Sequence, residues 1–155
     1  QDAGYSIQQA TEDRVQMFPQ YEEWIRMYYG RWEEMLGGAI KDTVVILNRL
    51  LKNPDYRVIA LTNWSAETFP VALERYEFLH RFEGIVVSGA EKMRKPFPEI
   101  YQLALDRYGF KAEDSLFIDD NKRNVEAASK MGITSIHFKS PDDLNAELEK
   151  IGIKH

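Results

Sequence analysis

Residues 115–138 read SLFIDDNKRNVEAASKMGITSIHF, and this stretch decides the fold. It begins with a short apolar run, passes through the acidic pair Asp119-Asp120 into a helical pattern, and ends, after Gly132, in a second β-rich run. A strand, a helix and a strand joined by short connections form a right-handed βαβ unit, in which the two strands are parallel. The stretch therefore predicts a parallel α/β fold.

The same alternation extends back to Lys41 and forward to the end of the chain. Two further β-rich runs cover residues 57–61 and 84–88, and the two runs of the opening stretch cover 115–118 and 135–138. All four are almost continuously apolar, which is typical of strands covered on both faces. Helices are expected after each of four starting signals, at Asp42, Ser65, Pro98 and Ser140. We therefore predict a Rossmann-like sheet of four parallel strands.

The first 38 residues differ from the rest because they are helical in pattern and rich in large aromatics. Residues 6–9 read SIQQ and fit a capping box, and Pro19 separates a first helix from a second. Apolar residues then recur every three to four positions, at Trp24, Ile25, Tyr28, Trp32 and Met35. This face indicates either helix packing or a cap that covers a substrate. Gly37-Gly38 reads as the boundary.

Composition excludes several classes of protein. The chain has 155 residues, 44% hydrophobic and 29% charged, enough for an ordinary folded core. It has no cysteine, and its net charge of −5 comes without a basic stripe, so we expect neither thiolate metal sites nor a nucleic-acid partner. No apolar run approaches the roughly 20 residues that span a bilayer. We expect a cytoplasmic protein with no membrane partner.

Polar residues follow three of the predicted strands. Thr62-Asn63 ends the first, Lys95 lies in the loop after the second, and Asp119-Asp120 ends the third. Each alone is also typical of a turn, a solvated loop or a helix N-terminus. Because ligands bind at the carboxyl ends of parallel strands, the three together predict one site. A hydroxyl and a lysine suit phosphate, and paired carboxylates suit Mg²⁺.

These residues resemble three motifs of the haloacid dehalogenase (HAD) superfamily, in that family's order. Thr62 in LTN matches motif II, Lys95 in KPFPEIY matches motif III, and Asp119-Asp120 in FIDD matches motif IV. The similarity runs from about residue 37 to 138, and it is greatest to the small-molecule phosphatases. The resemblance implies that residues 1–38 are the remnant of a helical cap domain. Residues 39–155 then form the HAD α/β core.

The resemblance also implies a role for each site residue. Thr62, helped by the Asn63 backbone, would bind the transferring phosphoryl group, and Lys95 would neutralise its charge. The metal ligands would be Asp119 and Asp120, holding Mg²⁺ directly or through water. Two further residues are less specific. Asn124 would orient the metal site or is an exposed helix residue, and Trp64 would contact substrate or serves packing.

The family's nucleophile is absent from this sequence. Motif I is an Asp at the end of a central first strand, usually followed two residues later by a second acid or a glycine, and no apolar run here ends in Asp-x-Asp or Asp-x-Gly. The family topology places that strand between the strands ending at Thr62 and Asp119. Because the chain begins with Gln1, we expect that an N-terminal segment of roughly 40–60 residues was lost, or persists as a separate peptide partner. We expect this chain alone to be inactive.

The leading hypothesis is therefore a Mg²⁺-dependent hydrolase of small organic phosphates that forms an aspartyl-phosphate intermediate. A metal-independent 2-haloacid dehalogenase and a non-catalytic relative that acts through protein contacts remain as alternatives. Receiver domains carry similar residues in another order. His80, His137 and His155 show no metal-site or triad spacing, so we expect structural roles for them.

Overall fold

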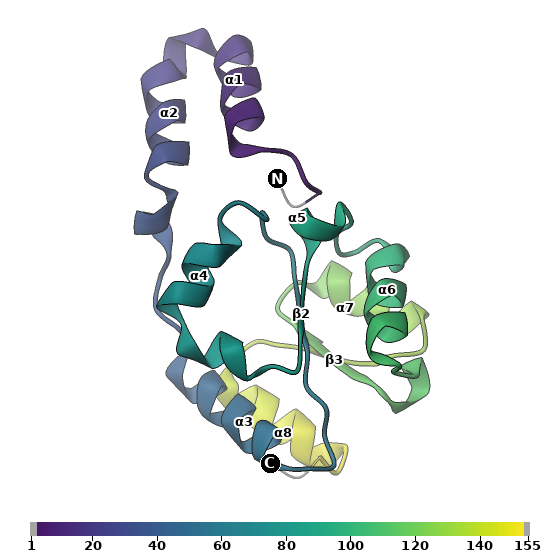
Figure 1. Cartoon of the computed structure of the whole chain (residues 1–155). Helices are drawn as coiled ribbons and strands as arrows, with labels where there is room; N and C mark the ends of the chain where they lie inside the picture. The colour runs from purple at the N-terminus through teal and green to yellow at the C-terminus, as the bar shows by residue number, and fades with distance from the viewer. Residues whose placement is uncertain (1–2, 154–155) are drawn as a thin grey trace.

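The computed structural model describes residues 3–153, and in it the N-terminal helices stand apart from the strands (Figure 1). We call residues 7–35 the helical arm. Its two longer helices run antiparallel and pack on each other. The elements of the arm are α1 (Ile7–Met17), the 3₁₀ turn η1 (Pro19–Tyr21), α2 (Glu22–Gly30) and the 3₁₀ turn η2 (Trp32–Met35).

The first helix begins and ends where the sequence predicts. Ser6 is its N-cap, and the Ser6 hydroxyl accepts a hydrogen bond from the Gln9 amide at 3.1 Å. The second hydrogen bond of the predicted capping box, between the Gln9 side chain and the Ser6 amide, is wrong. The Gln9 side chain donates to Asp13 at 3.1 Å instead. That partner lies one helical turn further on, where side chains meet readily. Pro19 separates α1 from α2 as predicted.

The apolar stripe of the arm is largely exposed. Trp24 is 67% exposed, Tyr28 58% and Met35 56%, and α2 has no buried residue. Helix packing is therefore the wrong explanation for these three side chains. The physical reason is that a single pair of helices has no second layer to cover its outer face.

The arm is tied to the rest of the molecule by hydrogen bonds at its two ends. At the start of α1, the Ile7 amide donates to the Glu67 carboxylate at 2.8 Å. At the other end, Arg75 donates to the carbonyl of Glu33 at 3.0 Å. The two ends of the arm therefore hold it above the strand ends.

After residue 38 the chain alternates between helices and short strands, as predicted. The elements are α3 (Lys41–Lys52), β1 (Ala60–Thr62), α4 (Phe69–Arg75), η3 (Glu77–Arg81), β2 (Ile85–Val87), α5 (Ser88–Glu91), α6 (Pro98–Tyr108), η4 (Ala112–Asp114), β3 (Leu116–Asp119), α7 (Lys122–Lys130), β4 (Thr134–His137) and α8 (Pro141–Lys150).

Local signals set most helix ends correctly. Pro98 opens α6, and Gly109 closes it in the left-handed conformation, with φ of 64°. Ser140 caps α8 by accepting from the Asp143 amide at 3.2 Å. The helix starts predicted at Asp42 and Ser65 are wrong. Ile40 precedes α3, and the Ser65 hydroxyl accepts from Glu67 within a turn that comes before α4.

The strands are shorter than predicted or shifted by one residue. The strand predicted at 57–61 is found at Ala60–Thr62. Before Ala60 the backbone forms only isolated hydrogen bonds with the neighbouring segment, such as the one from the Glu83 amide to the Val58 carbonyl. β3 begins one residue later than predicted and β4 one residue earlier. Asp119 is consequently the last residue of β3, and Thr62 is the last of β1.

The strands form two parallel pairs. β1 pairs with β2 from Ala60–Ile85 to Thr62–Val87, and β3 pairs with β4 from Leu116–Thr134 to Asp119–His137. Within residues 3–153, no hydrogen-bonded ladder joins the two pairs. β1 and β3 therefore each keep one edge without a strand partner, and all three β1 residues are only partly buried.

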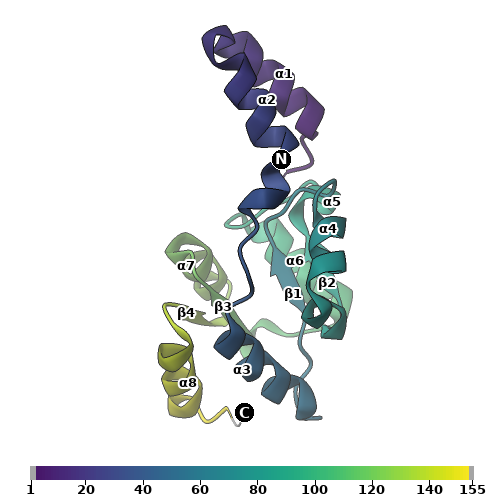
Figure 2. The same ribbon diagram turned by 90° about the vertical axis from the view of Figure 1, so that its left-hand side faces the viewer.

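Two apolar clusters hold the pairs in place. One joins β2 to α6 and α7, and its fully buried members include Val86, Ile100 and Ala128. The other cluster joins α3, β4 and α8 on the opposite face of the strand layer. Helices α3 and α8 lie side by side there (Figure 2). Helices thus cover both faces of the strand layer, as expected for parallel strands. No helix within residues 3–153 is long and apolar enough to cross a bilayer.

Candidate active site

Lys95 connects the carboxyl ends of the two strand pairs. Its Nζ donates to the carbonyl of Leu61, the neighbour of Thr62, at 2.7 Å. The same Nζ donates to Oδ2 of Asp119 at 2.7 Å. The two charged side chains are only 8% and 6% exposed. The structure thus brings together the ends of β1 and β3 and the loop that follows β2.

The Asp119 carboxylate is held on its other side as well. Its Oδ1 accepts from the Asn121 amide at 2.8 Å and from Asn124 Nδ2 at 2.9 Å. Asn124 lies on α7 and is 6% exposed, so it is not the exposed helix residue of the alternative interpretation. A carboxylate offers about four lone-pair directions, and three are occupied here. Asp119 is therefore fixed in orientation, with one direction left.

Asn63 fastens the loop that carries Lys95. Its side-chain oxygen accepts from the Lys95 amide at 2.9 Å, and its Nδ2 donates to the Lys95 carbonyl at 2.9 Å. A side-chain amide can satisfy both backbone groups of one residue because it carries a donor and an acceptor. The side chain of Asn63 therefore positions Lys95, whereas its backbone amide follows Thr62 at the strand end.

The remaining predicted residues lie at the same edge with fewer contacts. Thr62 is half-buried, and its hydroxyl has no hydrogen bond within residues 3–153. The Asp120 carboxylate is exposed and, within the same range, forms no ion pair. The Asp120 carbonyl lies 2.9 Å from Nε2 of His137, while His80 contacts the carbonyl of Leu73, so both histidines have structural contacts.

Ser88 is a supporting residue that the sequence did not reveal. It is completely buried, and its hydroxyl accepts from the Trp64 amide at 2.9 Å and donates to the Trp64 carbonyl at 3.3 Å. It fixes the loop after β1 against the end of β2. The neighbouring Gly89 has no room for a side chain, since a Cβ there would lie 2.5 Å from the Ala66 amide. The strand-end rule could have found Ser88, which directly follows β2.

Tyr101 supports the site from beneath. Its ring is 1% exposed, and its hydroxyl donates to the carbonyl of Asn124 at 3.0 Å. Burial and the negative charge of Asp119 raise the pKa of the Tyr101 phenol above its ordinary value. The phenol is therefore a fixed hydrogen-bond donor, and it holds the first turn of α7 in place.

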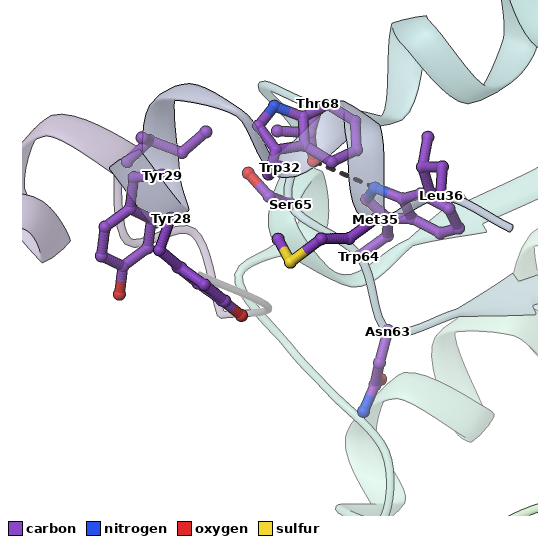
Figure 3. Close-up of a pocket in the computed structure, with 10 residues that line it drawn as sticks. Tyr28, Tyr29, Trp32, Met35, Leu36, Asn63, Trp64, Ser65 and Thr68 are labelled. Carbon is purple, nitrogen blue, oxygen red and sulfur yellow. Dashed lines mark hydrogen bonds between the residues drawn. The ribbon is translucent and has the colours of Figure 1, made fainter. Parts of the chain in front are cut away.

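Trp64 borders a cleft beneath the helical arm (Figure 3). Its indole Nε1 donates to the Thr68 hydroxyl at 3.0 Å, and its ring meets that of Phe69 edge-on, with centroids 5.8 Å apart. The side chain therefore packs on α4 and at the same time presents a surface to the cleft. Both interpretations of Trp64 are compatible with this position.

The donor set at the site suits Mg²⁺ better than a soft metal. Within residues 3–153, no three His, Asp or Glu side chains gather closely enough to form a metal site on their own. Asp119 has one free lone-pair direction, and Asp120 has a free carboxylate. Mg²⁺ commonly binds one or two carboxylates and keeps several waters. The residues present therefore fit a largely hydrated Mg²⁺.

Comparison with known proteins places the chain in a family. The model of the haloacid dehalogenase-like hydrolases matches residues 3–138. This chain belongs to that family. The resemblance seen in the sequence is therefore confirmed, and so is the Rossmann-type α/β fold of HAD hydrolases.

Two curated relatives of this chain carry different activities in their names. The sesquiterpene phosphatase astK of Aspergillus oryzae is 35% identical, over 59% of this chain and 47% of its own. The (S)-2-haloacid dehalogenase 4A of Burkholderia cepacia is 28% identical, over 76% of this chain and 50% of its own. The chain thus spans about half the length of these curated relatives.

A solved structure supports the same fold. A HAD-family enzyme of Bacteroides thetaiotaomicron, in a magnesium complex, superposes with a TM-score of 0.65 over 84% of this chain and 73% of its own. Its identity to this chain is 24%, so the likeness concerns the fold. At least one HAD-family enzyme has thus been solved with magnesium, the metal that Asp119 and Asp120 suit.

Proposed function

We propose that this chain supplies the phosphate- and metal-binding part of a Mg²⁺-dependent phosphohydrolase that acts on small organic phosphates. The observation that carries the proposal is the buried Lys95 ammonium, which touches both Leu61 at the end of β1 and Asp119 at the end of β3. An ammonium has three N–H donors, and these two contacts leave one donor for an anionic oxygen of a ligand. A phosphatase among the relatives supports the same reaction class.

Each residue has a role in this proposal. The Thr62 hydroxyl and the Asn63 backbone amide bind phosphoryl oxygens, and Lys95 offsets their charge. Asp119 and Asp120 hold Mg²⁺, which when bound withdraws negative charge from the phosphoryl group. Asn124 positions Asp119 through the hydrogen bond from its amide.

The nucleophile of the proposed reaction is an Asp on a strand that lies between β1 and β3. The edges of these two strands that lack a strand partner support that position, because the backbone N–H and C=O groups of a strand require hydrogen-bond partners. One carboxylate oxygen bonds to phosphorus as the ester oxygen leaves with the organic group. Water then cleaves the aspartyl-phosphate, releasing phosphate and restoring the carboxylate. We assign that strand to an upstream segment, either continuous with this chain or held as a separate peptide.

The domain boundary follows the same proposal. Residues 1–38 belong to a cap inserted after the nucleophile strand, and residues 39–155 to the core. Their outermost residues, 1–2 and 154–155, lie outside the described part of the chain.

Phosphate release from p-nitrophenyl phosphate tests this function. We expect no turnover by the 155-residue chain alone. A longer protein that also carries the upstream strand should turn over with Mg²⁺ and stop on addition of EDTA. In that protein, Lys95→Met should lower kcat/KM by about 10²–10³-fold, as for other preorganised charge-stabilising groups.

The matched control is Lys111→Met, since Lys111 is exposed and its side chain lies outside the site. This variant should keep full activity. Turnover by a rigorously pure 155-residue chain would refute the assignment of the nucleophile. EDTA-resistant phosphate release would refute the role of the acidic pair.

A metal-independent 2-haloacid dehalogenase is the second candidate, favoured by the relative that aligns over 76% of this chain. Such an enzyme also uses an Asp ester, but it needs no metal ligands. The unpaired carboxylate of Asp120 beside the Lys95–Asp119 pair counts against it. Chloride release from 2-chloropropionate that persists in EDTA would select this candidate instead.

A further inference from the structure

A cleft of about 270 Å³ lies between the helical arm and the loop after β1. From the arm, Tyr28, Tyr29, Trp32 and Met35 line it, and Trp64 forms the facing wall (Figure 3). At about 30 Å³ for each water, the volume corresponds to about nine waters, or an organic group of about ten non-hydrogen atoms. The cleft therefore has the size of a small ligand.

The side chains of Asn63, Ser65 and Thr68, which line the cleft, already have partners within the protein. The amide of Asn63 is bonded to the main chain of Lys95 through both of its ends. The hydroxyls of Ser65 and Thr68 accept hydrogen bonds from Glu67 and Trp64 at 3.2 Å and 3.0 Å. The other side-chain polar atoms of the lining belong to the phenols of Tyr28 and Tyr29 and to the indoles of Trp32 and Trp64, each at the edge of an aromatic ring. The walls consist chiefly of aromatic rings and aliphatic side chains.

No charged side chain is present among the described residues that line the cleft. A sugar or a nucleoside would bring more hydroxyl and amide groups into this space than the phenols of Tyr28 and Tyr29 and the indole N–H of Trp32 can pair. Burying such a group unpaired costs about 1–3 kcal/mol each. An apolar group instead gains about 25 cal/mol for each Å² removed from water. The lining therefore discriminates in favour of apolar ligands.

The cleft and the predicted phosphate site have Asn63 in common. Asn63 lines the cleft and also holds Lys95, and Trp64 stands two residues after Thr62. A ligand whose phosphoryl group lies between Thr62 and Lys95 therefore extends its organic part along Trp64 toward the arm. The exposure of Tyr28 (58%) and Met35 (56%) leaves apolar surface on the arm for that part to cover.

We infer that the substrate is a phosphate monoester of an apolar alcohol, aromatic or branched aliphatic, whose organic group fills the cleft between the arm and Trp64. This inference rests on the proposed phosphohydrolase function and adds the class of leaving group. Trp32 and Tyr29 are the specificity-determining residues on the arm, and Lys95 holds the phosphate.

Calorimetric titration of the 155-residue chain in Mg²⁺ tests the inference with four probes: 1-naphthyl phosphate, glycerol 3-phosphate, inorganic phosphate and 1-naphthol. We expect 1-naphthyl phosphate to bind at least about tenfold more tightly than glycerol 3-phosphate, a difference of about 1.4 kcal/mol. Trp32→Ala should remove this preference and leave the affinity for inorganic phosphate unchanged, which also reports that the variant is folded.

The matched control is Trp24→Ala, a truncation of the same residue type on the same arm. Trp24 is 67% exposed and does not line the cleft, so its variant should keep the tenfold preference. Equal affinity for the two esters, with inorganic phosphate still binding, would overturn the apolar-substrate inference alone.

A second set of binding results would refute the proposed phosphohydrolase function as well. If 1-naphthol binds as tightly as 1-naphthyl phosphate and inorganic phosphate does not bind, the phosphate site is absent and both proposals fail. Loss of 1-naphthyl phosphate affinity in Lys95→Met, with 1-naphthol affinity unchanged, would support both.

Discussion

The helical arm and the α/β core use the same kinds of large side chain to opposite effect. On the arm, Trp24 and Tyr28 are 67% and 58% exposed, whereas Tyr101 and Ile100 in the core are 1% and 0% exposed. The difference lies in the number of packed layers, because the core has helices on both sides of its strands and the arm is one helix pair. A periodic apolar face therefore indicates a core only where a second layer exists to cover it.

The largest effect that separates the two regions should come from truncating a buried side chain. Ile100→Ala should lower the free energy of unfolding by about 2–5 kcal/mol, because it opens a cavity between α6 and β2. Trp24→Ala on the arm should change it by less than about 0.5 kcal/mol, as for other exposed positions. Urea denaturation measures both. Comparable losses in the two variants would mean that the arm is packed in solution.

An intermediate effect should arise where the cleft meets the core, at Asn63. Asn63→Ala should lower the free energy of unfolding by about 1–3 kcal/mol, because the Lys95 amide and carbonyl lose their partners. Asn63→Asp keeps the acceptor for the Lys95 amide and should cost less. Hydrogen exchange of that amide, followed alongside urea denaturation, checks the mechanism. Unchanged exchange in Asn63→Ala would contradict it.

The smallest effect should be electrostatic and depends on pH. The Arg107 guanidinium hydrogen-bonds to Glu91 and holds the pKa of that carboxyl below its ordinary value of about 4.5. The pair therefore stabilises the folded state above about pH 4.5 and loses this effect as the pH falls through the folded-state pKa. The Glu91 side chain is 23% exposed and the Arg107 side chain 37%, so screening by solvent limits the contribution of the pair to stability to about 0.5 kcal/mol.

The variant Glu91→Gln should therefore be less stable than the parent near neutral pH and equally stable in acid, by thermal denaturation across that range. The arm offers a matched pair, Arg31–Glu34, in which the pKa of Glu34 is lowered by the same kind of hydrogen bond. Its side chains are 59% and 60% exposed, so Glu34→Gln should show a smaller change. A larger change on the arm would reverse the ranking of the two regions.

Local sequence signals predicted the helices of the core well. The proline and glycine that bound α6 and the serine that caps α8 act through neighbouring backbone groups, so their effect can be deduced from spacing alone. Strand bounds were less accurate, since a strand ends where its partner stops pairing. The early loss of pairing before Ala60 depends on a segment more than twenty positions away.

The candidate site was predictable in its residue types and its edge of the sheet, but not in its contacts. The packing of the two strand pairs decides that Lys95 contacts Asp119. It also decides that Asn63 hydrogen-bonds to the loop that carries Lys95. The buried supports Ser88 and Tyr101 were missed because serine and tyrosine are common in loops and helices. Only burial distinguishes them from their exposed counterparts.

By itself, the sequence determined the order of helices and parallel strands, the family, and the polar residues that gather at one edge of the sheet. The order of elements follows from short-range rules, since capping, turn formation and apolar periodicity act within a few residues of the chain, and the family follows from the resemblance of three short motifs. The tertiary structure decided which carboxylate faces the lysine, which aromatics stay uncovered, and where a cleft opens beneath the arm. Those outcomes depend on contacts between residues that are far apart in the chain, and the local patterns of a sequence do not specify such contacts.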